Sequence, residues 1–184
     1  MQGIDPAAAS LDGNTESNTA VSGYAGSASE AVHVSLGDRG ITEIAWEELE
    51  DRGCFISVTG KDPDNAADTS TSVNGDHCHG ISRVDSRKTV KFKDNPRYFV
   101  RGIAVCTNNK SNHRLKGIKV VAAKLPAGND DVQTLTVTNK KDRTNCKNWH
   151  QTVYCPSNKV ASGLNVKVKD SAFVGIGLEC KARD

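Results

Sequence analysis

The chain has 184 residues, of which 36% are hydrophobic and 5% aromatic, and its 24 basic and 22 acidic residues give a net charge of +2. This small charge, with both signs interspersed, gives no general argument for binding nucleic acid or a membrane surface, and no apolar run approaches the ~18 residues that a membrane span needs. The length suits one domain with a thin core, which disulfides would stabilise.

Residues 1–30 are expected to be a flexible leader. The first six residues resemble a vector-derived scar, and no signal peptide is visible there. Residues 7–30 are mostly Ala, Ser, Gly, Asn and Thr, which cannot bury enough surface to offset the entropy of ordering them. The folded part is therefore expected to be a single β-rich domain over residues 31–184.

Strand patterns dominate the rest of the chain. Residues 32–36 alternate as on a strand, whereas residues 41–50 fit both a helical face and strand alternation. After a short strand at 54–58, residues 59–80 read as a long polar loop. Further alternating segments lie at 89–92, 99–105, 115–121, 132–137, 153–155, 160–168 and 173–180, with turn signals at 94–96, 126–130 and 169–170. Many short strands with frequent turns predict an all-β sandwich, barrel or prism of antiparallel sheets.

The six cysteines are scattered, and none forms a Cys-x-x-Cys motif. An even count at such spacings favours three disulfides in an oxidising compartment, so a secreted or extracytoplasmic protein is predicted; free thiols in a cytosol are the alternative. A turn near residue 169 would place Cys155 and Cys180 across two strands. Cys78 and Cys106 are centred near the turn signal at 94–96, and Cys54 and Cys146 are left over. The expected disulfides are Cys155–Cys180, Cys78–Cys106 and Cys54–Cys146.

Two stretches of the chain repeat one pattern, a hairpin with a glycine in each strand. Such mid-strand glycines mark a bulge, a bend or a close backbone approach. The repeated positions are Pro96 and Pro156, Gly102 and Gly163, and Gly117 and Gly175.

The second copy resembles one repeat of the vitelline membrane outer layer protein I family. The resemblance is good over residues 149–182 and weaker over 95–123. No third copy aligns upstream, where Trp46 and the strand at 54–58 are the only remnant of the pattern. It is carried by Trp149, Cys155-Pro156, the run from Ala161 to Val168, and the run from Gly175 to Cys180.

The resemblance implies a secreted, disulfide-bonded β-prism of three similar sheets with an extracellular coat or glycan-associated role. By analogy of fold alone, sugars would be held in loops at one end.

Four residues are candidates for binding a ligand: Trp149, His150, Tyr154 and Asp170. An aromatic face can stack on the apolar side of a sugar ring, while nearby Asn and Asp side chains fix its hydroxyls. The alternative for Trp149 is that it caps the core. Mild clusters of Lys and Arg at 87–93 and 140–143 are either a solvated face or a contact for anionic glycans.

Asp62, Asp64 and Asp68 are candidate Ca²⁺ ligands, because carboxylates on a flexible loop suit that ion. The residue order of an EF-hand is absent, and a solvated loop is the alternative. No other cofactor is expected.

No Gly-x-Ser-x-Gly motif and no paired nucleophile and base are found, so an enzyme is not predicted. The sequence predicts a secreted, non-enzymatic binding module that recognises carbohydrate or a surface glycoprotein. The alternative is a structural component of an extracellular coat. No oligomeric state is predicted.

Overall fold

The structure is a computed structural model that describes residues 17–26, 28–49, 51–63, 65, 71–78, 86–91, 98–124, 132–138 and 146–182. Within these ranges all regular elements are β-strands, which confirms the all-β prediction. No helix in the described ranges has the length and apolarity to cross a membrane.

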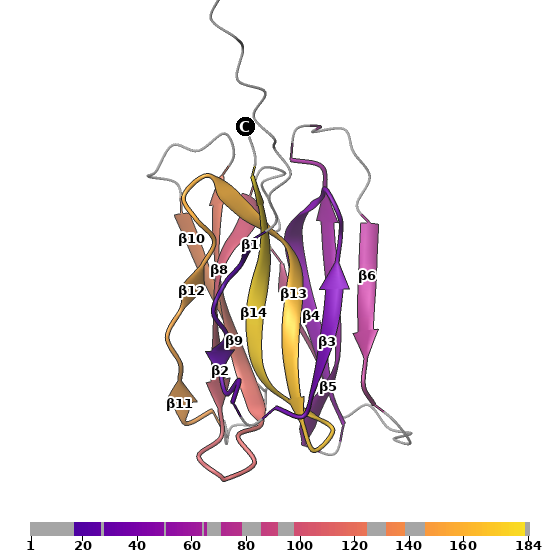
Figure 1. The fold of residues 1–184 in the computed structure, drawn as a ribbon, viewed down its shortest axis with the longest axis vertical. Coiled ribbons are helices and arrows are strands. Elements are labelled where there is room, and N and C mark those ends of the chain that lie inside the picture. Colours follow the sequence, from indigo (N-terminus) through magenta and orange to yellow (C-terminus); the bar gives the residue numbers. More distant parts are fainter. Residues whose placement is uncertain are drawn as a thin grey trace, which may run out of the picture.

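The strands form three antiparallel sheets, A, B and C, whose strands run along the long axis of the molecule (Figure 1). Sheet A contains β1 (Ser17–Asn18), β2 (Ser22–Gly23), β3 (Glu30–Ser35), β13 (Lys159–Lys169) and β14 (Ala172–Ala182). Sheet B contains β4 (Gly40–Leu49), β5 (Arg52–Lys61), β6 (Thr71–Asp76) and β7 (Ser86–Lys91). Sheet C contains β8 (Tyr98–Thr107), β9 (Leu115–Lys124), β10 (Val132–Thr138), β11 (Asn148–Trp149) and β12 (Val153–Tyr154).

Each sheet is centred on one long hairpin: β4–β5, β8–β9 or β13–β14. In sheets B and C the chain continues into a third strand beside the second and then returns to lie beside the first, which is a Greek key. In sheet A the two outer positions are filled from the other end of the chain, by β1 and β2 on β14 and by β3 on β13. The first strands therefore complete the sheet of the last hairpin.

Each long hairpin carries two register shifts at matching places. The extra residues in the first strands are Thr42, Arg101 and Ser162, and those in the second strands are Cys54, Lys116 and Val174. Equivalent bulges bend the three sheets alike, and the result is a β-prism. The predicted repeat is thus real, and β4–β5 is its third copy. Sequence comparison missed this copy because Glu43 and Phe55 stand where the other hairpins have glycine.

The inner faces of the three sheets share one apolar core. Trp46 of sheet B, Ile103 of sheet C and Phe173 of sheet A are all fully buried there. Burial of each such side chain stabilises the fold by about 1.5–3 kcal/mol.

All six cysteines are bridged, and one of the three expected pairs, Cys155–Cys180, is confirmed. The two cysteines are not partners across the hairpin as expected, because Cys180 pairs with Ala161; the bridge instead joins the residue after β12 to sheet A.

The other two expected pairs, Cys78–Cys106 and Cys54–Cys146, are wrong: the bridges are Cys54–Cys78 and Cys106–Cys146. Each closes within one sheet. Cys78 follows β6, which pairs with the strand that holds Cys54, and Cys146 precedes β11, which pairs with the strand that holds Cys106.

Three local expectations also need correction or completion. The leader expected over residues 1–30 is wrong for residues 17–30, which contain β1, β2 and the start of β3; residues 1–16 lie outside the described part. The polar loop expected at 59–80 contains the end of β5 and all of β6, and the ambiguous segment 41–50 belongs to β4 over its described residues 41–49. The turn at 169–170 is confirmed, whereas those at 94–96 and 126–130 lie outside the described residues.

Candidate functional site

The turns of the three long hairpins lie at the same end of the prism (Figure 1). We call this the turn end and define it by Asp51 of the β4–β5 turn, loop 108–114, turn 170–171 and segment 24–29 between β2 and β3, of which Ser27 lies outside the described residues. Loops that a rigid scaffold positions are common places for binding residues.

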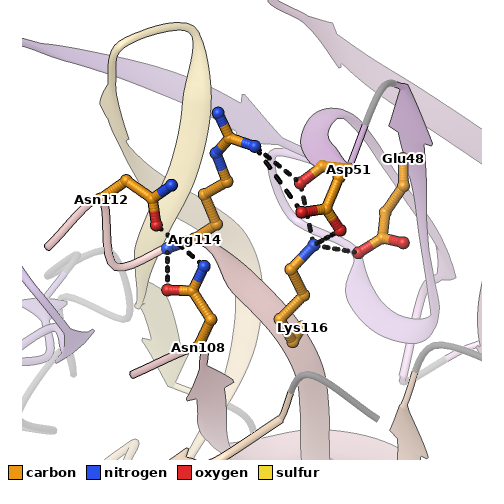
Figure 2. A network of polar contacts seen from close by, with 6 residues as sticks. All are labelled: Glu48, Asp51, Asn108, Asn112, Arg114 and Lys116. Carbon is orange, nitrogen blue, oxygen red and sulfur yellow. Dashed lines mark hydrogen bonds and ion pairs between the residues drawn. The ribbon is translucent and has the colours of Figure 1, made fainter. Parts of the chain in front are cut away.

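A buried ion network joins two of these turns (Figure 2). Lys116 is fully buried, and its Nζ donates to Asp51 Oδ1 at 2.6 Å, to the Asp51 carbonyl at 2.8 Å and to Glu48 Oε1 at 3.3 Å. Arg114 adds an ion pair to Asp51 Oδ2 at 3.7 Å. The β4–β5 turn is therefore fixed to the β8–β9 hairpin.

Loop 108–114 is held in shape by its own side chains (Figure 2). Asn108 Oδ1 accepts from the Arg114 amide at 3.1 Å, and Asn108 Nδ2 donates to Asn112 Oδ1 at 2.8 Å. His113 takes a left-handed backbone conformation with φ of 49°, which places its ring toward segment 24–29. The loop is thus ordered before any ligand arrives.

Three rings connect this loop to the first strands. Tyr24 stacks on His113 with ring centroids 3.6 Å apart and meets His150 edge-on at 5.0 Å. His150 Nε2 is hydrogen-bonded to Thr107 Oγ1 at 2.8 Å. Burial and the nearby His113 both lower the pKa of His150 below its usual value of 6.5.

This lowered pKa predicts an acid-sensitive contribution to stability. The folded state favours the neutral ring of His150, so below pH 6.5 the unfolded chain binds this proton more readily than the folded chain does. The contribution is present above pH 6.5 and is lost as the pH falls through the lower folded-state pKa. Thermal melts between about pH 7.5 and 5.5 should show a smaller loss for His150→Gln than for the wild type. Equal losses in the two proteins would contradict the assignment.

Segment 24–29 lies beside the β13–β14 turn. The Tyr24 amide donates to the Val174 carbonyl at 3.0 Å, and the Ser29 amide donates to the Val168 carbonyl at 3.0 Å, so the segment spans the base of that turn. Between these anchors the described residues are small, and Ala25 and Gly26 are exposed. Asp170 and Ser171 form the turn with φ of 50° and 57°, and Asp170 is exposed. An exposed carboxylate thus lies at the tip of a turn whose base is spanned by the segment anchored at Tyr24 and Ser29.

A second polar cluster, around Glu179 in sheet A, has its hydrogen bonds satisfied internally. Glu179 accepts from Ser35 at 2.7 Å and Ser162 at 3.1 Å, and it contacts His33 at 2.5 Å. Burial alone would raise the pKa of Glu179, but these hydrogen bonds outweigh burial and hold the pKa below its usual 4.5. We interpret this cluster as structural.

The four predicted ligand residues do not form one site. Asp170 and His150 lie at the turn end, whereas Trp149 and Tyr154 lie on the side of sheet C, 40% and 56% exposed. Trp149 therefore does not cap the core. Tyr24 was missed, although a single aromatic residue in a segment of Ala, Ser and Gly was a usable signal.

The predicted Ca²⁺ ligands are mostly outside the described structure. Asp62 follows β5, and Asp64 and Asp68 are not among the described residues. In the described part, no group of three or more His, Cys, Asp or Glu side chains could hold a metal ion. The Ca²⁺ site stays a prediction.

Solved structures with a similar fold are lectins. Calystegia sepium agglutinin superposes with a TM-score of 0.59 at 10% identity, covering 92% of this chain and 99% of that chain. A mannose-specific jacalin-related lectin from Morus nigra, in complex with mannose, gives 0.52 at 11% identity, covering 91% and 96%. A mannose-binding lectin from Champedak gives 0.54 at 12% identity, covering 91% and 97%. The chain therefore has the β-prism fold found in jacalin-related lectins. No protein-family model and no curated protein matches the sequence.

Proposed function

We propose that this protein is a non-enzymatic carbohydrate-binding module that holds a glycan at the turn end. The observation that carries the proposal is the exposed Asp170 carboxylate in a tight turn, at the same end of the prism as the segment that spans the base of this turn and the Tyr24–His113 stack. A carboxylate accepts hydrogen bonds from two sugar hydroxyls, backbone groups complete the polar contacts, and an aromatic face packs on the apolar side of the sugar ring.

Two further observations support this function. Solved structures of the same fold are complexes with a biantennary N-glycan and with mannotriose. The three disulfides suit an oxidising compartment outside the cytosol, where glycans and surface glycoproteins are the available partners.

A glycan array followed by titration with the best-bound glycan tests the proposal. Asp170→Asn keeps a residue that tolerates the left-handed turn but removes the charge, and we expect it to weaken binding about tenfold. Ser157→Ala, on the exposed link between β12 and β13 at the opposite end, is the control and should bind as the wild type does.

The coat alternative makes a different prediction. A protein that binds no glycan on the array but assembles as its concentration rises would be a structural coat component. That result would overturn the binding proposal.

A further inference from the structure

Two exposed aromatic residues, Trp149 and Tyr154, lie on one side of sheet C. Trp149 pairs with Cys106 and Tyr154 pairs with Gly102, both on β8. These two positions are four residues apart with no register shift between them, so their side chains leave the same face. Ile103 and Val105, which alternate with them, point into the core. Trp149 and Tyr154 therefore share the outer face of the sheet.

Between the two rings, the outward positions of β8 carry small residues. Tyr154 lies directly over Gly102, where an added Cβ would be 2.6 Å from Tyr154 Cδ1, so this glycine lets the ring lie flat on the strand. Ala104 is the next outward residue toward Trp149. Four residues of β8 place the backbone positions beneath the two rings about 13 Å apart. This distance exceeds one sugar ring and suits successive rings of an oligosaccharide.

Basic groups accompany both rings. Lys119 Nζ lies 4.8 Å from the centroid of the Trp149 ring. Arg101 precedes Gly102 and donates to the Pro156 carbonyl at 3.4 Å, while its Nε is buried without a hydrogen-bond partner in the described part of the chain. Lys147, just before β11, is exposed.

The charged residues in the described part of sheet C also share one sign, because all of them are basic. Its described strands and connections, residues 98–124, 132–138 and 146–158, contain seven Lys and Arg residues and no Asp or Glu, and five of the seven lie outside the ion network of Lys116, Arg114 and Asp51. The whole chain, in contrast, has 24 basic and 22 acidic residues. Such a surface attracts an anionic polymer.

We propose that this face, which we call the side face (Gly102, Ala104, Lys119, Trp149 and Tyr154), binds a linear acidic polysaccharide. Trp149 and Tyr154 stack on two sugar rings of the chain, and Lys119 and Arg101 pair with its carboxylate or sulfate groups. The site goes beyond the proposed turn-end site and is independent of it. Stacked aromatics with cations also suit single-stranded nucleic acid, but the disulfides favour a compartment where acidic polysaccharides are the common polyanions.

The test titrates the intact protein with four probes of similar length: polygalacturonate, heparin and neutral cello-oligosaccharides, with oligo-dT as the nucleic-acid probe. We expect one or both acidic oligosaccharides to bind more tightly than the neutral one and oligo-dT, with an affinity that falls as salt rises. Trp149→Ala and Tyr154→Ala should each weaken binding about tenfold, whereas Tyr154→Phe should retain it. Lys119→Gln should lower the salt dependence by about one ion.

Melting curves show whether the variants fold, which is expected because both rings are exposed. Asp170→Asn should leave acidic-polysaccharide binding unchanged, so a failure of the turn-end site is distinguishable from a failure here. Equal binding of neutral and acidic oligosaccharides, wild-type affinity in both alanine variants, or tighter binding of oligo-dT would overturn the proposal.

Discussion

Replacing Lys116 by methionine is expected to lower the free energy of unfolding by about 3–5 kcal/mol, because it removes the buried ammonium group that pairs with Glu48. Lys116 is fully buried, and Glu48 is 5% exposed, so water cannot replace the ammonium group beside that carboxylate. Asp51 is half-exposed and can be solvated. The cost therefore comes mainly from Glu48.

Chemical denaturation measures this effect, and β9 supplies a matched control. Lys119 lies on the same strand but is only partly buried, so Lys119→Met should change the free energy of unfolding by less than about 1 kcal/mol. Adding Glu48→Gln to Lys116→Met should restore part of the loss, since the buried carboxylate charge that Lys116 balanced is then removed. Equal effects of Lys116→Met and Lys119→Met would show that the network contributes little.

The bulge in the second strand of each long hairpin contains a different extra residue in each of the three sheets. Lys116 is the extra residue of the second-strand bulge in sheet C, where sheet B has Cys54 and sheet A has Val174. The same backbone site thus holds an ion network, a disulfide or an apolar contact. In sheet C, the ion network at this site fixes loop 108–114 to the β4–β5 turn.

A chain that begins at residue 28 is expected to unfold well below the melting temperature of one that begins at residue 17. The removed strands hydrogen-bond along β14, through the Thr19 amide to the Leu178 carbonyl at 2.9 Å among others. Ser22 Oγ also accepts from the buried Val105 amide at 3.0 Å, which ties them to sheet C. We expect a loss of roughly 3 kcal/mol, or about 6–12 °C.

Differential scanning calorimetry on the two chains measures this loss. The single substitution Ser22→Ala tests one of the removed contacts. It leaves the Val105 amide without its acceptor and should lower the free energy of unfolding by about 1–3 kcal/mol. The exposed Ser157→Ala should cost almost nothing. Equal melting temperatures for chains beginning at residues 17 and 28 would mean that β1 and β2 do not stabilise the fold.

The parts of the fold that could be predicted are those where the residue types depend on the backbone conformation. Gly102, Gly163, Gly117 and Gly175 follow the bulges and so revealed two hairpins. The residues of β6 are polar on both faces apart from Val73, so no alternation marked this strand. Missing β6 removed the neighbour of Cys54 and led to the wrong disulfide pairs. β1 and β2 are two residues long and dock through backbone hydrogen bonds, which composition does not show.

The site was predicted only in pieces. Asp170 was recognisable from its turn, but its neighbours come from segment 24–29, far away in the sequence. Trp149 and His150 are adjacent in the chain, yet Trp149 lies on the side face and His150 contacts Thr107 and Tyr24. Sequence proximity therefore suggested one site where the fold builds two surfaces.

Glycan binding at the turn end is tested most directly by following backbone amide chemical shifts during titration with the best-bound glycan. Shifts should cluster in segment 24–29, loop 108–114 and residues 169–172. In the Asp170→Asn variant, shifts of the same size should require about tenfold more glycan. A bound glycan that shifts amides elsewhere and leaves these three segments unchanged would contradict the account.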